Sequence, residues 1–170
     1  QIDCEMSFVE QEDVMAIMEK MVQRIFKEIL NVDVKLPLKT MTYAEAMERY
    51  GSDKPDTRFG YELTDISDIV KTCGFGVFAN AAKDGSVRGI NVKGKAEDFS
   101  KKQIGKLEDH AKTYKAKGLA WIKVGENREV TSPIAKFFTA EEMTAILDRM
   151  DAKEGDLLLF VADKDSVVFD

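Results

Sequence analysis

The chain has 170 residues, of which 44% are hydrophobic and 33% charged, and its formal net charge is −6. This length suits one large domain or a domain with an appended part, and no apolar run approaches the roughly 20 residues that a membrane helix needs. The acidic balance excludes a nucleic-acid binder that works by overall charge alone, but it leaves room for a local RNA-binding patch.

The two cysteines, Cys4 and Cys73, are too few and too far apart for a disulfide framework. Cys4 falls on the apolar side of an alternating segment, and Cys73 follows a helical apolar stripe. We therefore expect both to be buried in a reducing compartment, the cytoplasm. One histidine and two distant cysteines cannot supply the usual ligands of zinc, so we expect no metal site.

The first eight residues alternate strictly between polar and apolar side chains. A period of two predicts a strand with Gln1, Asp3 and Glu5 on its polar face. Two carboxylates on one strand face are unfavourable, which indicates either a site for a cation or an ammonium group, or an ordinary solvated edge strand. The abrupt start of this pattern suggests a piece of a longer protein.

Two helices are predicted next. Apolar residues recur at helical spacing over residues 11–30, and the methionine-rich stripe they form is expected to be core packing. A shorter helix at 43–50 begins with a capping box of Thr42 and Glu45 and ends at Gly51. Residues 50–60 are dense in turn formers and charges, which predicts a loop and a subdomain boundary. The loop is either a plain surface turn or a segment that presents Lys54 and Arg58 to phosphates.

The remaining residues mix strands and helices. We expect helices at 65–73, capped by Thr64, at 101–117, with a capping box of Ser100 and Gln103 and with Gly118 after its end, and at about 140–150, with a box of Thr139 and Glu142. Strands are predicted at 75–82, 87–93, 119–124 and 157–162, with the start of another at 167–169. The first two are joined by a hairpin turn at Lys83-Asp84-Gly85, and the fourth is central. This order predicts an α+β fold with a mainly antiparallel sheet and helices on one side.

Lysines are concentrated between residues 93 and 117. The pattern is that of a solvated helix face or, alternatively, of an RNA-binding stripe. The candidates for RNA contact are Lys101, Lys102, Lys106 and Lys112. His110 is expected at the surface or in packing, and Trp121 in the core.

Three segments carry a resemblance to a known family. Residues 1–8, Gln-Ile-Asp-Cys-Glu-Met-Ser-Phe, resemble the second strand of motif 2 in bacterial-type aspartyl-tRNA synthetases of class II. Residues 49–60 resemble the family's Arg-Tyr-Gly-Ser-Asp-Lys-Pro-Asp-Leu-Arg segment, with Thr57 in place of leucine. The runs at 117–124 and 132–137 resemble the inserted GAD domain of that family.

The resemblance implies a domain organisation and an activity. Residues 1–60 would be part of the class II catalytic domain, 61–165 the GAD insert and 166–170 the start of a return to the catalytic domain. The parent would be a cytoplasmic homodimer that activates aspartate with ATP and Mg²⁺ and charges tRNA(Asp), or tRNA(Asp/Asn). Gln1, Asp3 and Glu5 would bind the aspartate substrate, and Asp3 would pair with its ammonium group.

The resemblance also bears on this chain by itself. The motif 2 arginine would precede Gln1, and motifs 1 and 3 are absent, so we expect no cofactor binding and no aspartate activation. Residues 1–9 are expected to be displaced, packed on the 11–30 helix, or paired between copies in a self-association. The insert is either an accessory module that contacts tRNA or a spacer and interaction domain.

Overall fold

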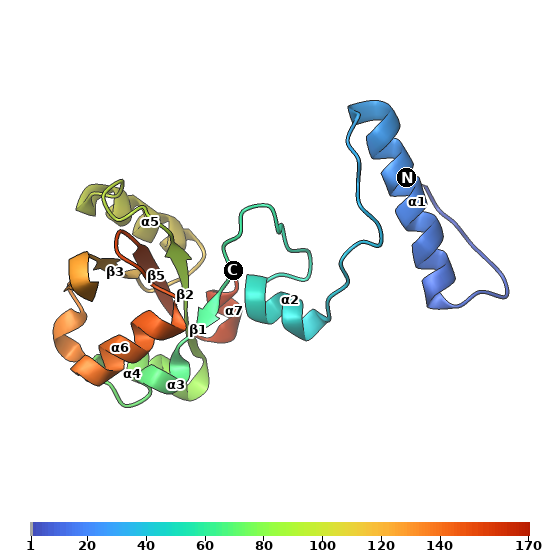
Figure 1. Cartoon of the computed structure of the whole chain (residues 1–170). Helices are drawn as coiled ribbons and strands as arrows, with labels where there is room; N and C mark the ends of the chain where they lie inside the picture. The colour runs from blue at the N-terminus through green and yellow to red at the C-terminus, as the bar shows by residue number, and fades with distance from the viewer. Residues whose placement is uncertain (1) are drawn as a thin grey trace. The chain divides into compact units, whose positions relative to one another are not determined.

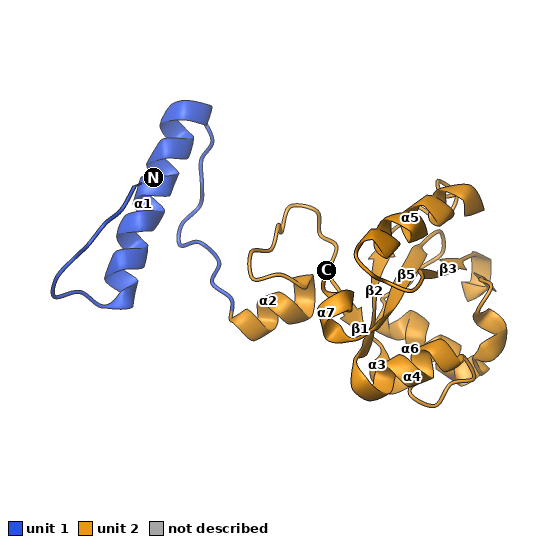
Figure 2. Cartoon of the chain, turned by 180° about the vertical axis from the view of Figure 1, so that it is seen from behind, with its two compact units in different colours: residues 1–41 blue, residues 42–170 orange. Residues whose placement is uncertain are grey.

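The computed structural model describes residues 2–170, and the chain divides into two compact units, residues 1–41 and 42–170 (Figure 2). The predicted boundary at residues 60 and 61 does not coincide with this division, because residues 42–60 belong to the second unit. The proposed domain limits stay a prediction.

The first unit is built on one helix, α1 (Gln11–Leu30), as predicted. Its cap is polar, since the Glu10 amide donates to Asp13 Oδ2 over 3.0 Å, and it ends at Asn31 in the left-handed conformation. The following segment returns along the helix, where Gln23 Nε2 donates to the Val34 carbonyl over 2.7 Å. The Leu38 amide, in turn, donates to Glu19 Oε1 over 2.9 Å.

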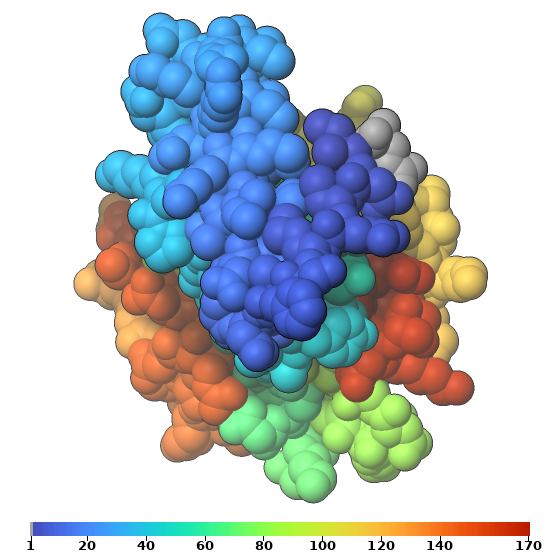
Figure 3. Space-filling view, turned by 90° about the vertical axis from the view of Figure 1, so that its right-hand side faces the viewer, coloured from blue at the N-terminus to red at the C-terminus, as the bar shows by residue number. Residues whose placement is uncertain are grey.

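The apolar stripe of α1 has no core to enter. No residue of α1 is buried, and Ile17 and Ile29 are 49% and 74% exposed. The expectation that this stripe is core packing is therefore wrong for the described chain. Figure 3 shows the surface of this unit in blue.

The segment before α1 forms no strand within residues 2–10. A strand needs a neighbour to take its backbone hydrogen bonds, and no strand among residues 2–170 pairs with this segment. The segment lies outside any sheet, in agreement with the expected displacement, and Cys4 is exposed, so its predicted burial is wrong. Gln1 lies outside the described residues.

The second unit is organised around a five-stranded antiparallel sheet of order β1-β2-β5-β3-β4 (Figure 1). Its strands are β1 (Thr64–Asp65), β2 (Ser86–Val92), β3 (Ala120–Val124), β4 (Val130–Thr131) and β5 (Leu157–Asp163). The predicted central position of β5 is confirmed. In the register of β2 and β5, Gly89 lies opposite Phe160, and a Cβ on Gly89 would come within 2.4 Å of the Phe160 ring. Only glycine fits there without a shift.

Helices cover both faces of this sheet. The helices are α2 (Tyr43–Tyr50), α3 (Ser67–Val70), α4 (Gly76–Asp84), α5 (Lys101–Thr113), α6 (Ala140–Arg149) and α7 (Asp165–Val168), with 3-10 turns at Glu126–Arg128 and Ala135–Phe137. Leu158 and Phe160 of β5 pack with α3, α4 and α6, whereas Leu157 and Leu159 pack with Ile104 of α5 (Figure 1). The α+β class and the antiparallel sheet are confirmed. The expectation that helices cover only one side of the sheet is wrong, because both faces of β5 are apolar and helices pack on each.

The capping boxes at Ser100 and Thr139 are confirmed, and Thr42 caps α2 by accepting from the Glu45 amide over 3.1 Å. Thr64 is in β1 instead of a cap; the N-cap of α3 is Ile66, and the Ser67 amide donates to Asp65 Oδ1 over 2.8 Å. Helix α5 stops at Thr113, with Lys115 in the left-handed conformation, so Gly118 is not its end.

Two predicted strands are helices. Residues 76–82 fall in α4 and Phe75 is its N-cap, because Phe75, Phe78 and Ala82 lie at helical spacing and pack on the sheet, and the alanines favour a helix. The predicted hairpin turn at residues 83–85 is consequently the end of α4. Residues 167–169 belong to the turn of α7 and its end, where the Val168 amide donates to the Lys164 carbonyl over 3.1 Å.

Candidate functional site

The predicted aspartate-binding residues are not assembled into a site. Asp3 and Glu5 are exposed and lie in the extended segment of the first unit, and Gln1 is outside the described residues. Since the strand is not formed, the period of two that would place the two carboxylates on one face does not operate. Their assignment as substrate ligands stays a prediction.

A buried arginine ties α2 to the sheet. Arg88 of β2 has a side chain 8% exposed, and its guanidinium reaches Glu48 Oε2 over 2.8 Å and Asp65 Oδ2 over 3.2 Å. It also donates to the Glu48 carbonyl over 3.1 Å. Burial alone would lower the pKa of Arg88, but the neighbouring carboxylates hold the pKa above its ordinary value. The charge is therefore permanent and paired.

The same arginine reaches the C-terminal segment. Its guanidinium lies 5.0 Å from the centroid of the Phe169 ring, and Ser86 Oγ beside it donates to Asp165 Oδ1 over 2.7 Å. Gly51, after α2, is so close to Phe169 that a Cβ would come within 3.1 Å of its carbonyl oxygen. We name Glu48, Gly51, Arg88, Asp165 and Phe169 the junction, because they hold the segments at both ends of the second unit on β2.

A second polar cluster fixes the other end of β2. Asp156 is 3% exposed and accepts from Asn91 Nδ2 over 2.9 Å, the Gly94 amide over 2.7 Å and the Lys153 amide over 3.0 Å. Burial raises the pKa of Asp156, but these hydrogen bonds outweigh it and the pKa lies below its ordinary value. The carboxylate is a structural anion at the entrance to β5.

The predicted RNA-contact lysines all lie exposed on α5. Lys112 is paired with Glu108 over 2.7 Å, which also raises the pKa of Lys112. Lys101, Lys102 and Lys106 have no ion pair within the described residues. The structure therefore separates one neutralised lysine from three free ones in the N-terminal half of the helix.

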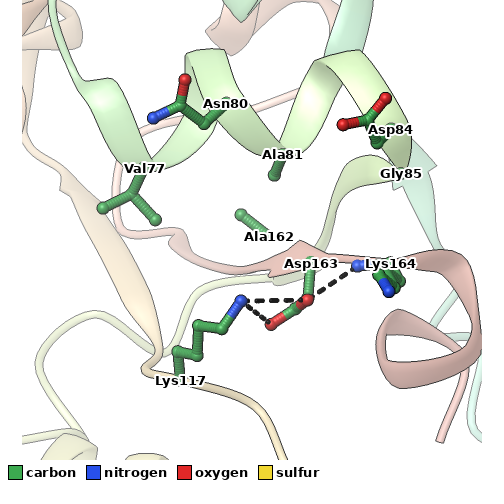
Figure 4. A pocket seen from close by; sticks show the side chains of 9 residues that line it. All are labelled: Val77, Asn80, Ala81, Asp84, Gly85, Lys117, Ala162, Asp163 and Lys164. Atoms are coloured by element: carbon green, nitrogen blue, oxygen red, sulfur yellow. Dashed lines mark hydrogen bonds and ion pairs between the residues drawn. The ribbon is translucent and has the colours of Figure 1, made fainter.

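A cavity of about 320 Å³ lies between α4 and the end of β5, with Val77, Asn80, Ala81 and Asp84 of α4 along one side (Figure 4). Lys117 and Asp163 lie together on the side opposite α4, with Nζ 3.1 Å from Oδ2 (Figure 4). The backbone amide of Lys164 and the Lys117 ammonium group lower the pKa of Asp163. Lys117 and Asp163 neutralise each other, so the Asp163 carboxylate is not a base near neutral pH.

The loop at residues 50–60 does not present its arginine freely. Arg58 forms a bidentate ion pair with Asp56, which lowers the pKa of Asp56 to about 2, and it lies over the Phe59 ring. Lys54 is exposed. The alternative of a plain surface turn therefore accounts for Arg58.

Other candidate groups are structural. Cys73 is buried as predicted, and burial raises the pKa of its thiol, so it is not an activated nucleophile. His110 is exposed and meets Tyr114 edge-on at 5.4 Å. Within residues 2–170, the structure holds no group of three or more histidine, cysteine, aspartate or glutamate side chains that could bind a metal ion. No helix of the described part is long and apolar enough to cross a membrane.

Sequence reasoning missed the junction and the Asp156 cluster. Arg88 has a signal, because it stands inside the run Ser86-Val87-Arg88-Gly89-Ile90, where a charge is out of place unless it is paired. No such signal marks its partners in the sequence. Glu48 and Asp165 are 40 and 77 positions from Arg88, and only the fold brings them together.

The sequence that forms this sheet, with α5 on one face and three helices on the other, matches a known family. The family model described as "GAD domain" matches residues 78–170. This is more than half of the chain, and the chain belongs to the GAD domain family.

Relatives extend the similarity over nearly the whole length of the chain. The chain is 58% identical to the "Aspartate--tRNA ligase" of Clostridium perfringens (strain 13 / Type A) over 99% of its length. It is 59% identical to the "Aspartate--tRNA(Asp/Asn) ligase" of Thermoanaerobacter sp. (strain X514) over its full length. In both cases the chain spans 28% of the relative's own length. The resemblance found in the sequence is thereby confirmed.

Proposed function

We propose that the chain is a segment of an aspartate–tRNA ligase, an enzyme that activates aspartate with ATP and then charges tRNA(Asp). The observation that carries the proposal is 58–59% identity, over nearly the whole chain, to enzymes of that name. In this proposal the parent uses ATP and Mg²⁺, acts in the cytoplasm and is a homodimer. Relatives of the Asp/Asn kind match equally well, and charging of tRNA(Asn) by the parent would assign it to that kind.

The exposed stripe of α1 supports the idea that the chain works within a larger protein. Large apolar side chains such as Ile29 and Leu30 are 74% and 60% exposed, a state that is costly to leave open on a helix of 20 residues. We propose that this stripe, and the alternating residues 2–8, pack on parts of the ligase outside this chain. Asp3 and Glu5 would then share one strand face, where Asp3 could pair with the ammonium group of aspartate.

We propose that the ATP and Mg²⁺ of the parent enzyme are held by residues outside this chain. Asp3 and Glu5 lie on an exposed segment, and the described residues contain no group suited to a metal ion. We therefore propose that the chain alone cannot activate aspartate, because catalysis needs the reacting groups held together in one geometry. The test is aspartate-dependent ATP–pyrophosphate exchange. We expect no exchange from the chain and exchange from the parent enzyme, and activity of the chain alone would refute this.

The role of the GAD domain within the ligase is a separate proposal. The free lysines of α5 favour an accessory module that contacts tRNA over a plain spacer. Deletion of residues 61–165 from the parent enzyme separates the two. A tRNA-contacting module predicts a raised KM for tRNA with unchanged exchange activity, whereas a spacer predicts an unchanged KM.

A further inference from the structure

A surface cavity lies on the α5 face of the sheet, beside the start of α5. It has a volume of about 310 Å³ and is lined by Lys101, Trp121, Thr131, Ser132 and Pro133. This volume is at the low end of the range for small-ligand pockets, about 300–1000 Å³. Trp121 is only partly buried against the core, so the sequence-based expectation of a core residue is incomplete.

The floor of this cavity is held rigidly. Ser132 Oγ donates to the Trp121 carbonyl over 2.6 Å and accepts from the Ile134 amide over 3.1 Å. Trp121 lies in β3 directly opposite Leu159 of the central strand. These contacts fix the backbone that carries Trp121, so less freedom remains to be lost when a ligand packs on its side chain, which favours binding.

Free positive charge adjoins the cavity. Lys101 lines it, and Lys102 and Lys106 follow within five residues of the same helix, a rise of about 7.5 Å. These three have no ion pair within the described residues, whereas the nearby Lys95 is paired with Asp98 over 2.6 Å. The cavity thus combines an indole, an exposed threonine hydroxyl and ammonium groups that no carboxylate neutralises.

We infer that this cavity binds an unpaired nucleobase of RNA, with the adjoining phosphates on Lys101 and its neighbours on α5. Aromatic side chains bind single-stranded bases by stacking, and lysines follow the phosphate backbone. An acidic peptide would satisfy the lysines but would not need the indole. The inference deepens the proposed tRNA ligase function and rests on it for the identity of the RNA.

The test uses the fact that Trp121 is the only tryptophan of the chain. Its fluorescence therefore reports on this cavity alone. The full chain is titrated with a tRNA(Asp) transcript, with a single-stranded RNA oligonucleotide and with polyglutamate. We expect saturable quenching by both RNAs, weakened by salt as phosphate contacts require, and no quenching by polyglutamate.

Two variants locate the contact, with binding followed by the anisotropy of labelled RNA. Lys101→Ala should weaken RNA binding about threefold or more. The slope of the logarithm of the binding constant against the logarithm of the salt concentration should fall by about 1, the loss of one phosphate contact. The matched control Lys71→Ala removes an exposed charge at the end of α3 and should bind like the unmodified chain. Trp121→Leu keeps apolar packing but removes the ring, and should weaken binding about fivefold or more. Circular dichroism checks that each variant is folded.

Three results would overturn the inference: no RNA binding at low salt, binding without any change in Trp121 fluorescence, or equal quenching by polyglutamate. None of these results would contradict the proposed ligase function. That function fails on its own if the parent enzyme does not charge tRNA(Asp), even when this chain binds RNA.

Discussion

Helices α1 and α6 have the same kind of sequence and different surroundings. Each begins with a polar cap and carries an apolar stripe along one side. In α6 the stripe is buried, with Ile146 and Leu147 0% and 2% exposed, whereas α1 has no buried residue. Local signals are therefore enough to define a helix, but burial depends on a second element that the same chain has to supply.

The largest effect expected from this comparison is in the core. Ile146→Ala should lower the free energy of unfolding of the second unit by about 2–5 kcal/mol, because it leaves a cavity in a packed cluster. The matched change Ile25→Ala, at a side chain 40% exposed on α1, should cost under about 1 kcal/mol. Urea unfolding measures both. Equal costs would mean that α1 is buried in solution.

The junction extends the comparison to α2, a short helix that the sheet holds by polar contacts. Arg88→Met should destabilise the second unit by about 2–3 kcal/mol, since it leaves Asp65 without its partner and Glu48 without its anchor. Hydrogen exchange should at the same time become faster in α2 and α7 than in β5. An unchanged exchange pattern would show that the junction does not hold these segments.

The Asp156 cluster gives a pH-dependent version of the same contrast. The pKa of Asp156 is lower in the folded chain than its ordinary value, so its stabilisation is present above about pH 4 and is lost as pH falls through the folded pKa. Asp156→Asn should cost about 1–2 kcal/mol at pH 7, and the difference from the unmodified chain should shrink at pH 3.

Asp109→Asn, on the exposed surface of α5, is the control for this pH series. Its unfolding free energy should stay within about 0.5 kcal/mol of the unmodified chain at pH 7. A gap between Asp156→Asn and the unmodified chain that is constant with pH would contradict the role of the charge.

The smallest effect concerns the caps. Thr139→Ala removes the hydroxyl that accepts from the Glu142 amide over 3.2 Å, and should cost about 1 kcal/mol of the global unfolding free energy. Asp13→Ala removes the carboxylate that accepts from the Glu10 amide at the start of α1, and should reduce helicity without moving the main unfolding transition. A shift of that transition by Asp13→Ala would show that α1 unfolds together with the sheet.

Caps, helix periodicity and the central strand could be predicted from the sequence because each depends on residues close together in the chain. Residues 75–82 could not, since Phe75-Gly76-Val77-Phe78 favours a strand locally and only packing on β5 decides for a helix. Residues 2–8 show the opposite failure, in which a clear strand pattern has no neighbour to pair with.

The candidate sites follow the same rule. The lysines of α5 were visible as a cluster, but which of them are free depends on partners such as Glu108 and Asp98. Trp121 was visible as an aromatic residue in a strand, but its position beside Lys101 depends on how α5 crosses the sheet. Spacing in the sequence could not have brought these two side chains together.

Because Gly51 and Phe169 are in contact, the polypeptide between them begins and ends at neighbouring points in space. In a longer chain, the loop-closure entropy of such a segment rises only slowly with the number of residues in it. The length of the polypeptide between Gly51 and Phe169 can therefore change at little cost to a surrounding fold, as long as these two residues stay in contact. Gly51 allows this contact because it has no side chain. A larger residue at this position would push positions 51 and 169 apart.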